Sequence, residues 1–301
     1  MTEWFLDIVL GTCLVLCALA IQLAPRLYTG VVLYIGFGLL VALTWARLGV
    51  PDLALAEAAI GAGLMGVLLL NALSQLPEGR SRRHQPTHRL LTVVTGIALA
   101  VLLWRAIEPL DGLTSPLPDL VYSQLSRTGV EHPVTAVLLN IRAWDTLLEL
   151  LVALLAVLGL KQLQLPSLQI ASPWPLLSAW SLWLAPLSLL MGCYLLWRGA
   201  FAPGGAFQAG ALWASGAVIL RLNGRLPTLS WRHPGLRFLV VAGLVVFLAV
   251  TLTTALWGQA WLSYPPEWAK TLILTIEIAA SLSIATSLTL LVVAENEELK
   301  A

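Results

Sequence analysis

Residues 271–292, TLILTIEIAASLSIATSLTLLV, form an apolar run about as long as a helix needs to cross a bilayer. One carboxyl group, Glu277, interrupts the run near its middle. A strand of a membrane barrel would alternate polar and apolar residues over about ten positions, and this stretch does not. The run therefore predicts a transmembrane helix, extended to 269–294, with an ionisable side chain at membrane depth.

Eight further apolar stretches of similar length precede this one. Hydrophobic residues make up 58% of the 301 residues and charged residues only 11%, a balance too apolar for a soluble domain. Because backbone amides in lipid must be paired internally, we expect an all-α fold, a polytopic transmembrane helical bundle of about nine helices. The expected spans are 4–24, 29–47, 52–73, 89–107, 134–160, 176–198, 206–222, 235–257 and 269–294.

The basic residues predict the orientation of this bundle. Placing the N-terminus outside puts eleven of the 17 Lys and Arg residues on the cytoplasmic side and five on the other, and leaves Arg142 within a span. Short cytoplasmic loops carry such an excess, so we expect an outside N-terminus and a cytoplasmic C-terminus. The same rule accounts for the basic loops, which therefore do not indicate that the protein binds nucleic acid. Acidic residues precede the first apolar run, which is therefore expected to be a retained helix rather than a signal peptide.

Two polar loops divide the chain into three expected modules. The basic stretch 74–89 and the proline-rich stretch 164–175 are the borders. They separate a three-helix module (1–80), a two-helix module (81–165) and a four-helix module (166–301). A further loop, 108–133, contains four prolines and is expected to lie along the outer surface.

Glu57 is the first candidate site residue, because ionisable groups within spans are costly and often functional. It lies in the third expected helix, with Ala54 and Gly61 on its own face. Small neighbours allow another helix to approach closely. We favour a role in ion movement, and the alternative is a buried structural hydrogen bond. Asp52, just after Pro51, is interpreted as a helix cap that complements the helix dipole.

A second group follows in VLLNIRAWDTLLELL. Arg142, Asp145 and Glu149 are spaced i, i+3 and i+7, so they share one helical face. The arginine can neutralise one carboxylate but not both, and the net negative charge suits a cation or proton site. The alternative is a static ion pair at a helix entrance. The span 134–160 is either one continuous helix or an interfacial segment that kinks into the membrane near these residues.

Glu277 and the stretch FAPGGAFQAGALWASG (201–216) complete the candidates. Glu277 could relay protons, and a structural contact with a partner helix is the alternative. The turn residues interrupt the apolar pattern directly before a helix, where free amides and small residues could line a cavity; a simple tight turn is the alternative. The turn and cavity candidates are Pro203, Gly204, Gly205, Phe207 and Gln208.

Motifs for catalysis, cofactors and resident metals are not found in the sequence. It contains no P-loop, Rossmann fingerprint, HExxH motif or cysteine cluster. The three cysteines lie in apolar stretches and are interpreted as small buried hydrophobes. His84, His88, His132 and His233 fall in loops or at helix ends and are interpreted as surface residues. We therefore expect neither an enzyme nor a bound cofactor or resident metal.

Three blocks of sequence resemble components of the Mrp-type multisubunit cation/proton antiporters. PDLALAEAAIGAGL (51–64) and HPVTAVLLNIRAWDTLLELLVALLAVLGL (132–160) are similar to the C-terminal region of MrpA, the large component. The first block is also similar to a small component of membrane-bound hydrogenases. YLLWRGAFAPGGAFQAGALWASGAVIL (194–220) resembles the MrpB signature, usually a histidine near the turn followed by PGGGFQGG. In this chain Asn140 replaces the usual aspartate of the second block, and the signature histidine is absent.

The resemblance implies the end of MrpA fused to MrpB, in the cytoplasmic (inner) membrane of a bacterium. It implies partners as well: the large proton-pumping subunits related to respiratory complex I and other small membrane subunits. The carboxylates that it carries over to a sodium and proton path are Glu57, Asp145, Glu149 and Glu277. It implies transient sodium near the first three of them. Two alternatives remain, namely a module of a redox-driven or inorganic-carbon-uptake complex, and a purely structural scaffold whose buried charges specify helix pairing.

Overall fold

A computed structural model describes residues 2–74, 76, 86–110, 116–163, 175–257 and 261–293. Within these ranges every regular element is a helix. The α-helices are α1 Thr2–Leu23, α2 Leu27–Arg47, α3 Pro51–Ala56, α4 Met65–Ser74, α5 Pro86–Ile107, α6 Leu117–Gln124, α7 Pro133–Ala136, α8 Ala143–Gln162, α9 Pro175–Arg198, α10 Ala206–Leu222, α11 Pro234–Leu256 and α12 Ala269–Val292. Two π-helical segments are η1 Glu57–Leu64 and η4 Val137–Ile141, and two short 3₁₀ turns are Glu108–Leu110 and Leu125–Arg127.

Seven helical stretches of the described ranges are long and apolar enough to cross a membrane. One of them, Pro51–Ser74, runs through α3, η1 and α4 without a break. Two shorter apolar helices, Val93–Ile107 and Ala206–Leu222, coincide with the two remaining expected spans. The all-helical, multi-pass fold predicted from the apolar runs is therefore confirmed.

The expected span 134–160 is not one continuous helix. Arg142 has φ −123° and ψ 37°, which are not helical angles, and it separates η4 from α8. The kink that one of the two alternatives predicted is therefore present at Arg142. The expected outer loop, 108–133, also contains a short helix, α6, which the sequence pattern did not predict. The predicted module borders near residues 80 and 165 lie outside the described residues.

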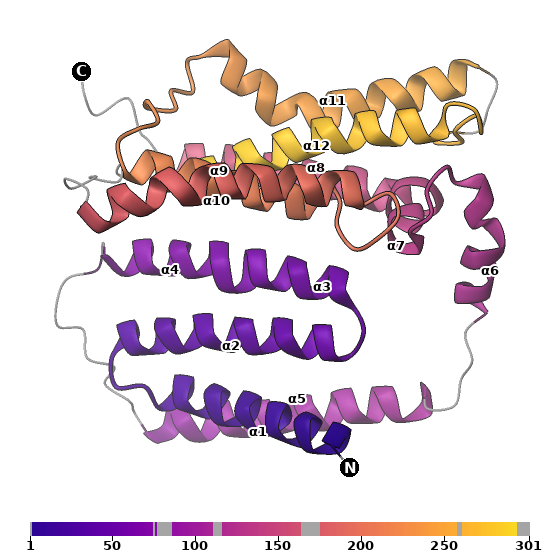
Figure 1. Ribbon diagram of the computed structural model, residues 1–301. Helices are drawn as coiled ribbons and strands as arrows, with labels where there is room; N and C mark the ends of the chain where they lie inside the picture. The colour runs from indigo at the N-terminus through magenta and orange to yellow at the C-terminus, as the bar shows by residue number, and fades with distance from the viewer. Residues whose placement is uncertain are drawn as a thin grey trace.

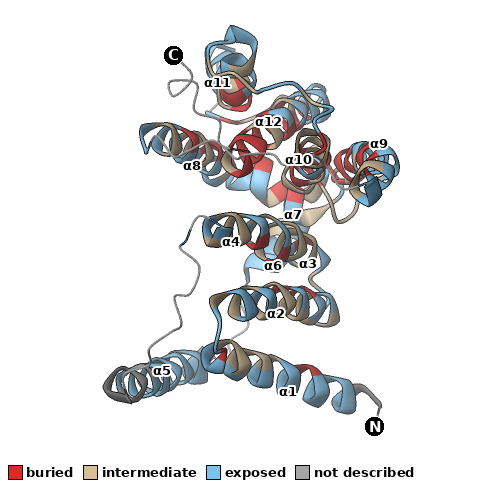
Figure 2. Ribbon diagram, turned by 90° about the vertical axis from the view of Figure 1, so that its left-hand side faces the viewer, coloured by how far each residue is buried: buried red, intermediate tan, exposed pale blue. Residues whose placement is uncertain are grey.

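α12 is the centre of the better-packed half of the molecule. It lies between α10 and α11 and also contacts α8, and buried residues gather along these helices (Figures 1 and 2). Glycines on the two flanking helices allow the close approach. A Cβ atom on Gly210 would come within 3.0 Å of Ile284 and of the Ser281 carbonyl, and one on Gly243 would lie 3.0 Å from the Ala280 Cα.

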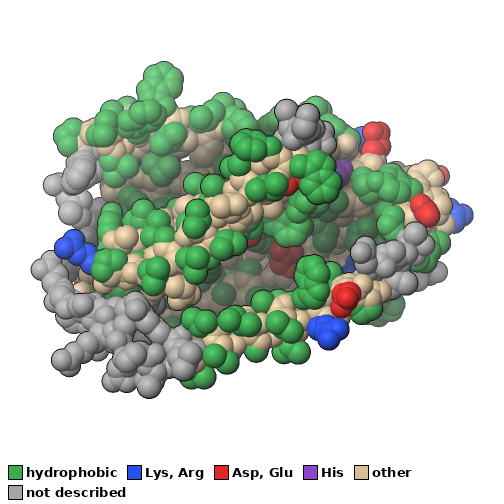
Figure 3. Space-filling view, turned by 90° about the horizontal axis from the view of Figure 1, so that it is seen from below, with side chains coloured by type: hydrophobic (Ala, Val, Ile, Leu, Met, Phe, Trp, Pro, Cys, Tyr) green, Lys and Arg blue, Asp and Glu red, His purple; other side chains and the backbone are tan. Residues whose placement is uncertain are grey.

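The other half consists of α1 to α5 and is much more exposed. α3 and η1 contact α10, α2 packs on η1, and α1 packs on α2 (Figure 1). Viewed from the side of α1 and α5, the surface is largely apolar, and the charged side chains lie mostly toward its ends (Figure 3). Trp104 of α5 is 71% exposed. So large an exposed apolar surface needs lipid or a partner protein to cover it, as in a multi-pass membrane protein.

Candidate functional site

The turn between α9 and α10 positions the candidate site. Gly204 and Gly205 have φ values of 157° and 114°, a region that favours glycine. The Gly205 N–H donates to the Leu195 carbonyl oxygen over 2.9 Å, which closes the turn against the end of α9. A Cβ atom on Gly204 would lie 2.5 Å from that same oxygen. The two glycines therefore let the chain reverse tightly and begin α10 at Ala206.

The start of α7 is fastened to this turn. The Ala200 carbonyl oxygen accepts hydrogen bonds from the backbone N–H groups of Glu131, over 2.8 Å, and His132, over 3.1 Å. The Thr135 hydroxyl donates to the Gly199 carbonyl oxygen. Two segments more than 60 residues apart in the sequence are thus held side by side.

Asp52 brings α3 to the same place. Its Oδ1 accepts a hydrogen bond of 3.1 Å from the Gly204 N–H, and its Oδ2 lies 2.9 Å from His132 Nε2. The side chains of His132 and Asp52 are only 12% and 10% exposed. α3, the α7 start and the α9–α10 turn therefore meet at one carboxylate.

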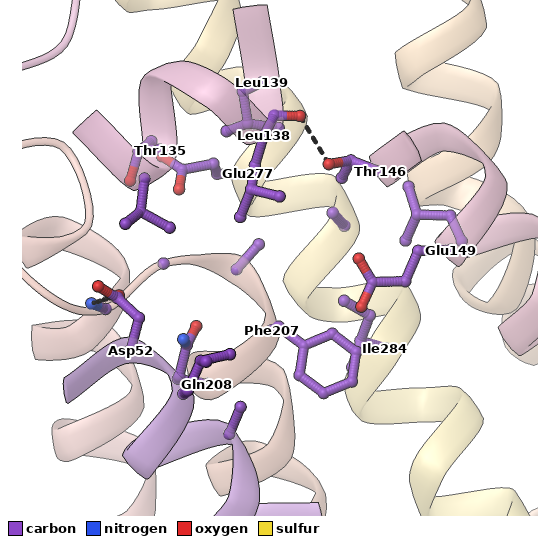
Figure 4. A pocket seen from close by; sticks show the side chains of 18 of the residues that line it. Asp52, Thr135, Leu138, Leu139, Thr146, Glu149, Phe207, Gln208, Glu277 and Ile284 are labelled. Carbon is purple, nitrogen blue, oxygen red and sulfur yellow. Dashed lines mark hydrogen bonds between the residues drawn. The ribbon is translucent and has the colours of Figure 1, made fainter. Parts of the chain in front are cut away.

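A cavity of about 260 Å³ lies next to this junction (Figure 4). Five segments contribute to its wall: α3 with η1, α7 with η4, α8, α10 with the turn before it, and α12. Among its described lining residues, three are carboxylates and none is Lys or Arg. Its lining residues include Asp52, Thr135, Thr146, Glu149, Gly204, Gly205, Phe207, Gln208, Glu277 and Ala280.

Glu277 is the most deeply placed of these carboxylates, with 2% of its surface exposed. Its Oε1 would lie 3.3 Å from a Cβ atom on either Gly199 or Gly205, so the carboxylate sits against the turn. No hydrogen bond or ion pair to this carboxylate is found within the described ranges. α10 begins directly after Gly205, and its first N–H groups favour negative charge nearby.

Glu149 reaches the cavity from α8, and in Figure 4 its carboxylate points toward Phe207 and Ile284. The other two members of the predicted face do not line the cavity. Arg142 and Asp145 form an ion pair of 2.7 Å with side chains that are 68% and 49% exposed. The predicted triad therefore separates into a surface ion pair and one carboxylate in the cavity.

Glu57 is half-buried in η1 and does not line the cavity, although its helix neighbours Ala56 and Ile60 do. Its Oε1 would lie 2.0 Å from a Cβ atom on Gly61, so the side chain folds along its own helix over that glycine. Gly38 of α2 packs against the same part of η1, since its own Cβ would lie 3.0 Å from the Ala62 nitrogen. Of the small neighbours predicted around Glu57, Gly61 thus lies against the Glu57 side chain and near Gly38 of α2.

The turn candidates are distributed unevenly. Four of them line the cavity: Gly204, Gly205, Phe207 and Gln208. Pro203 does not; it lies in the turn, directly before Gly204 in the chain. All four of the lining residues belong to one short stretch that begins at the turn glycines, which explains why they arrive at the cavity together.

Two interpretations from the sequence are corrected here. Asp52 lies in the first turn of α3, but no side chain caps that helix, because the Asp52 carboxylate bonds His132 and Gly204 instead. His132 is not a surface residue but a partner of that carboxylate. These residues are 80 positions apart, and the sequence holds no local signal for the pair. His233 is exposed, as expected, and the side chains of His84 and His88 lie outside the part of the chain that the structure describes.

Comparisons with known proteins agree with two of the three sequence blocks. Residues 12–78 match the MbhD family of MBH subunits, and residues 176–295 match the domain related to the MnhB subunit of Na⁺/H⁺ antiporters. No curated protein sequence matches this chain.

One solved structure has the same fold over nearly the whole chain. A chain of the Mrp complex from Dietzia sp. DQ12-45-1b superposes with a TM-score of 0.80 and 22% sequence identity. The match covers 97% of the present chain but 35% of that one, so the present chain spans about a third of the length of this relative. At this identity the likeness shows the fold.

Proposed function

We propose that this chain, an Mrp-type antiporter component that joins an MbhD region to an MnhB-related region, contributes carboxylates to a path for sodium ions and protons. The observation that carries the proposal is the cavity. Asp52, Glu149 and Glu277 face one space of about 260 Å³ whose described lining holds no Lys or Arg. Carboxylates without a fixed cation attract mobile cations or protons, and the cost of burying them makes a functional role the default inside a membrane.

The four carboxylates of the predicted path then have unequal roles. Glu149 and Glu277 face the cavity and are the principal candidates, with Gln208 as a neutral oxygen ligand beside them. Asp145 is already paired with Arg142 at the surface, and Glu57 folds over Gly61. For Glu57 the alternative of a structural role in helix packing is therefore the better supported, and for Asp145 the alternative of a static ion pair.

The setting of this function is part of the proposal. The chain acts in the cytoplasmic membrane of a bacterium, with its N-terminus outside and its C-terminus in the cytoplasm. It works beside other antiporter subunits, including the large proton-pumping ones, since it spans about a third of its structural relative. The module division at residues 80 and 165 is supported by the two matched ranges, 12–78 and 176–295, which lie on either side of the central module.

The test uses the whole complex in inverted membrane vesicles, with sodium-dependent proton exchange as the readout. Glu277→Gln and Glu149→Gln should each lower the exchange rate at least about tenfold, which corresponds to about 1.4 kcal/mol in the barrier. Glu108→Gln is the matched control, because this carboxylate is exposed and pairs with Arg105 away from the cavity. Native mass spectrometry should find each variant in the assembled complex.

The same measurement separates the alternatives. Normal exchange in both cavity variants would refute the ion-path proposal. Loss of assembly in both would favour the scaffold role. Sodium-independent activity of the native complex, together with a redox or inorganic-carbon partner in its mass spectrum, would favour the related-complex alternative.

A further inference from the structure

The pair formed by Asp52 and His132 crosses the wall of the cavity. Asp52 lines the cavity, whereas His132 does not; it lies in the loop that precedes α7. The imidazole Nε2 and the carboxylate Oδ2 are 2.9 Å apart. The pair therefore connects the space that holds Glu149 and Glu277 with the loop outside it.

Both members of the pair are held in place by the surrounding backbone. The Gly204 N–H fixes Asp52 Oδ1 over 3.1 Å, and the Ala200 carbonyl oxygen accepts the His132 N–H over 3.1 Å. Both backbone groups belong to the α9–α10 turn. The turn thus holds the His132 backbone and the Asp52 carboxylate, and the contact between the two side chains uses only Nε2 of the two ring nitrogens.

From this geometry we propose that Asp52 and His132 form a proton-exchange site that passes protons between the loop before α7 and the carboxylates of the cavity. A proton from water binds His132 Nδ1, and the proton on Nε2 passes to Asp52 Oδ2, so one proton arrives and one leaves. A water-assisted shift of the remaining proton from Nδ1 to Nε2 then restores the starting tautomer. Asp52 then delivers its proton to the cavity that it lines. Histidine suits this task because its charge changes near neutral pH, and its two nitrogens can accept and donate at once.

The groups around the imidazole are consistent with proton transfer in this direction. Asp52 faces it from α3, and the exposed Glu131 precedes it in the chain. Glu277 of α12 and Glu149 of α8 line the same cavity as Asp52. The α9–α10 turn contributes backbone groups to the pair. All the titratable neighbours named here are acids, and each of them can act as a proton donor or acceptor.

This inference rests on the proposed function, and its test has to separate the two. His132→Gln keeps an N–H donor for Asp52 but cannot take up a proton, and Asp52→Asn keeps an acceptor for the Gly204 N–H without the charge. His233→Gln is a matched control, because His233 also precedes a proline at a helix start but is exposed. The variants are introduced into the whole complex, and sodium-dependent proton exchange is measured between about pH 5 and 8.

We expect His132→Gln and Asp52→Asn to assemble, to exchange at least about tenfold more slowly, and to lose the pH dependence of the wild type in this range. His233→Gln should keep both rate and profile. A wild-type rate and profile in His132→Gln, alongside an inactive Glu277→Gln, would overturn the proton-exchange site and leave the proposed function standing. Failure of both pair variants to assemble would assign the pair a structural role and overturn the inference. Unchanged exchange in Glu277→Gln and Glu149→Gln would remove the proposed function and this site with it.

Discussion

Replacing Gly204 by alanine tests whether the α9–α10 turn holds the site together. Two costs follow from its geometry. Its φ of 157° lies in a region where a side chain costs about 1–3 kcal/mol. The new Cβ would also lie 2.5 Å from the Leu195 carbonyl oxygen. The other nearest atoms are backbone atoms of Leu195 and Gly199, which cannot move aside as easily as a side chain. Overpacking of this kind costs about 1–3 kcal/mol.

Together these two costs predict that Gly204→Ala lowers the free energy of unfolding by about 2–6 kcal/mol. The chain purified in detergent can be unfolded by heat while tryptophan fluorescence is recorded. A fall in Tm of about 4 °C or more is expected, at about 2 °C for each kcal/mol. The same substitution should reduce sodium-dependent exchange in the complex, since the Gly204 N–H also holds Asp52.

Gly159→Ala is the control for this experiment. Gly159 lies within α8 and has no atom within 4 Å of the position that a Cβ would take. Alanine should stabilise the helix there by about 0.5–1 kcal/mol. If Gly204→Ala unfolds at the same temperature as the wild type, the turn does not have the tight geometry described for Gly204. The placement of Asp52 and Glu277 around that turn would then be wrong as well.

Three further predictions concern the packing, the surface charges and the loop before α12. Phe247→Ala should cost about 3 kcal/mol because this ring is fully buried in the core, whereas Phe238→Ala, at a position 62% exposed, should cost little in the same denaturation experiment. Arg142→Ala should change stability by less than about 1 kcal/mol, since its ion pair with Asp145 is exposed; a larger loss would place this pair in a buried contact. Burial raises the pKa of the Tyr264 phenol, so the wild type should lose stability as the pH rises beyond the ordinary tyrosine value of about 10, and Tyr264→Phe should lose less. At neutral pH this variant should be as stable as the wild type or up to about 1 kcal/mol more so, because the Tyr264 hydroxyl has no hydrogen-bond partner within the described residues.

The helices could be predicted from the sequence because their signal is local. Each span is a run of apolar residues whose length is set by the bilayer, so Glu277 could be placed at membrane depth from its neighbours alone. The turn at Gly204 and Gly205 could be predicted for the same reason. Arg142 in an apolar run indicated a kink, and the kink is present, but the pattern also permitted a continuous helix.

The composition of the cavity could not be predicted, because it depends on contacts between distant segments. Helical periodicity places Arg142, Asp145 and Glu149 on one face but does not say which neighbour covers it. Of these three residues only Glu149 lines the cavity, which Glu277 also lines. The bond between Asp52 and His132 joins positions 80 apart. In the sequence each of these two residues has a simpler local explanation, as a helix cap or as a surface residue.

The central claim, that ions and protons reach Glu277 and Glu149 through the cavity, is tested most directly by the reactivity of single cysteines in the assembled complex. Ala280 lines the cavity with 2% of its surface exposed, and Ile278, two positions earlier in α12, is 43% exposed on the outer surface of the bundle. With Cys13, Cys17 and Cys193 replaced by serine, a charged, membrane-impermeant thiol reagent should label Ala280→Cys, and sodium should slow the reaction. It should not label Ile278→Cys, which faces lipid or a neighbouring protein of the complex. Labelling of Ile278→Cys with none at Ala280→Cys would contradict the account.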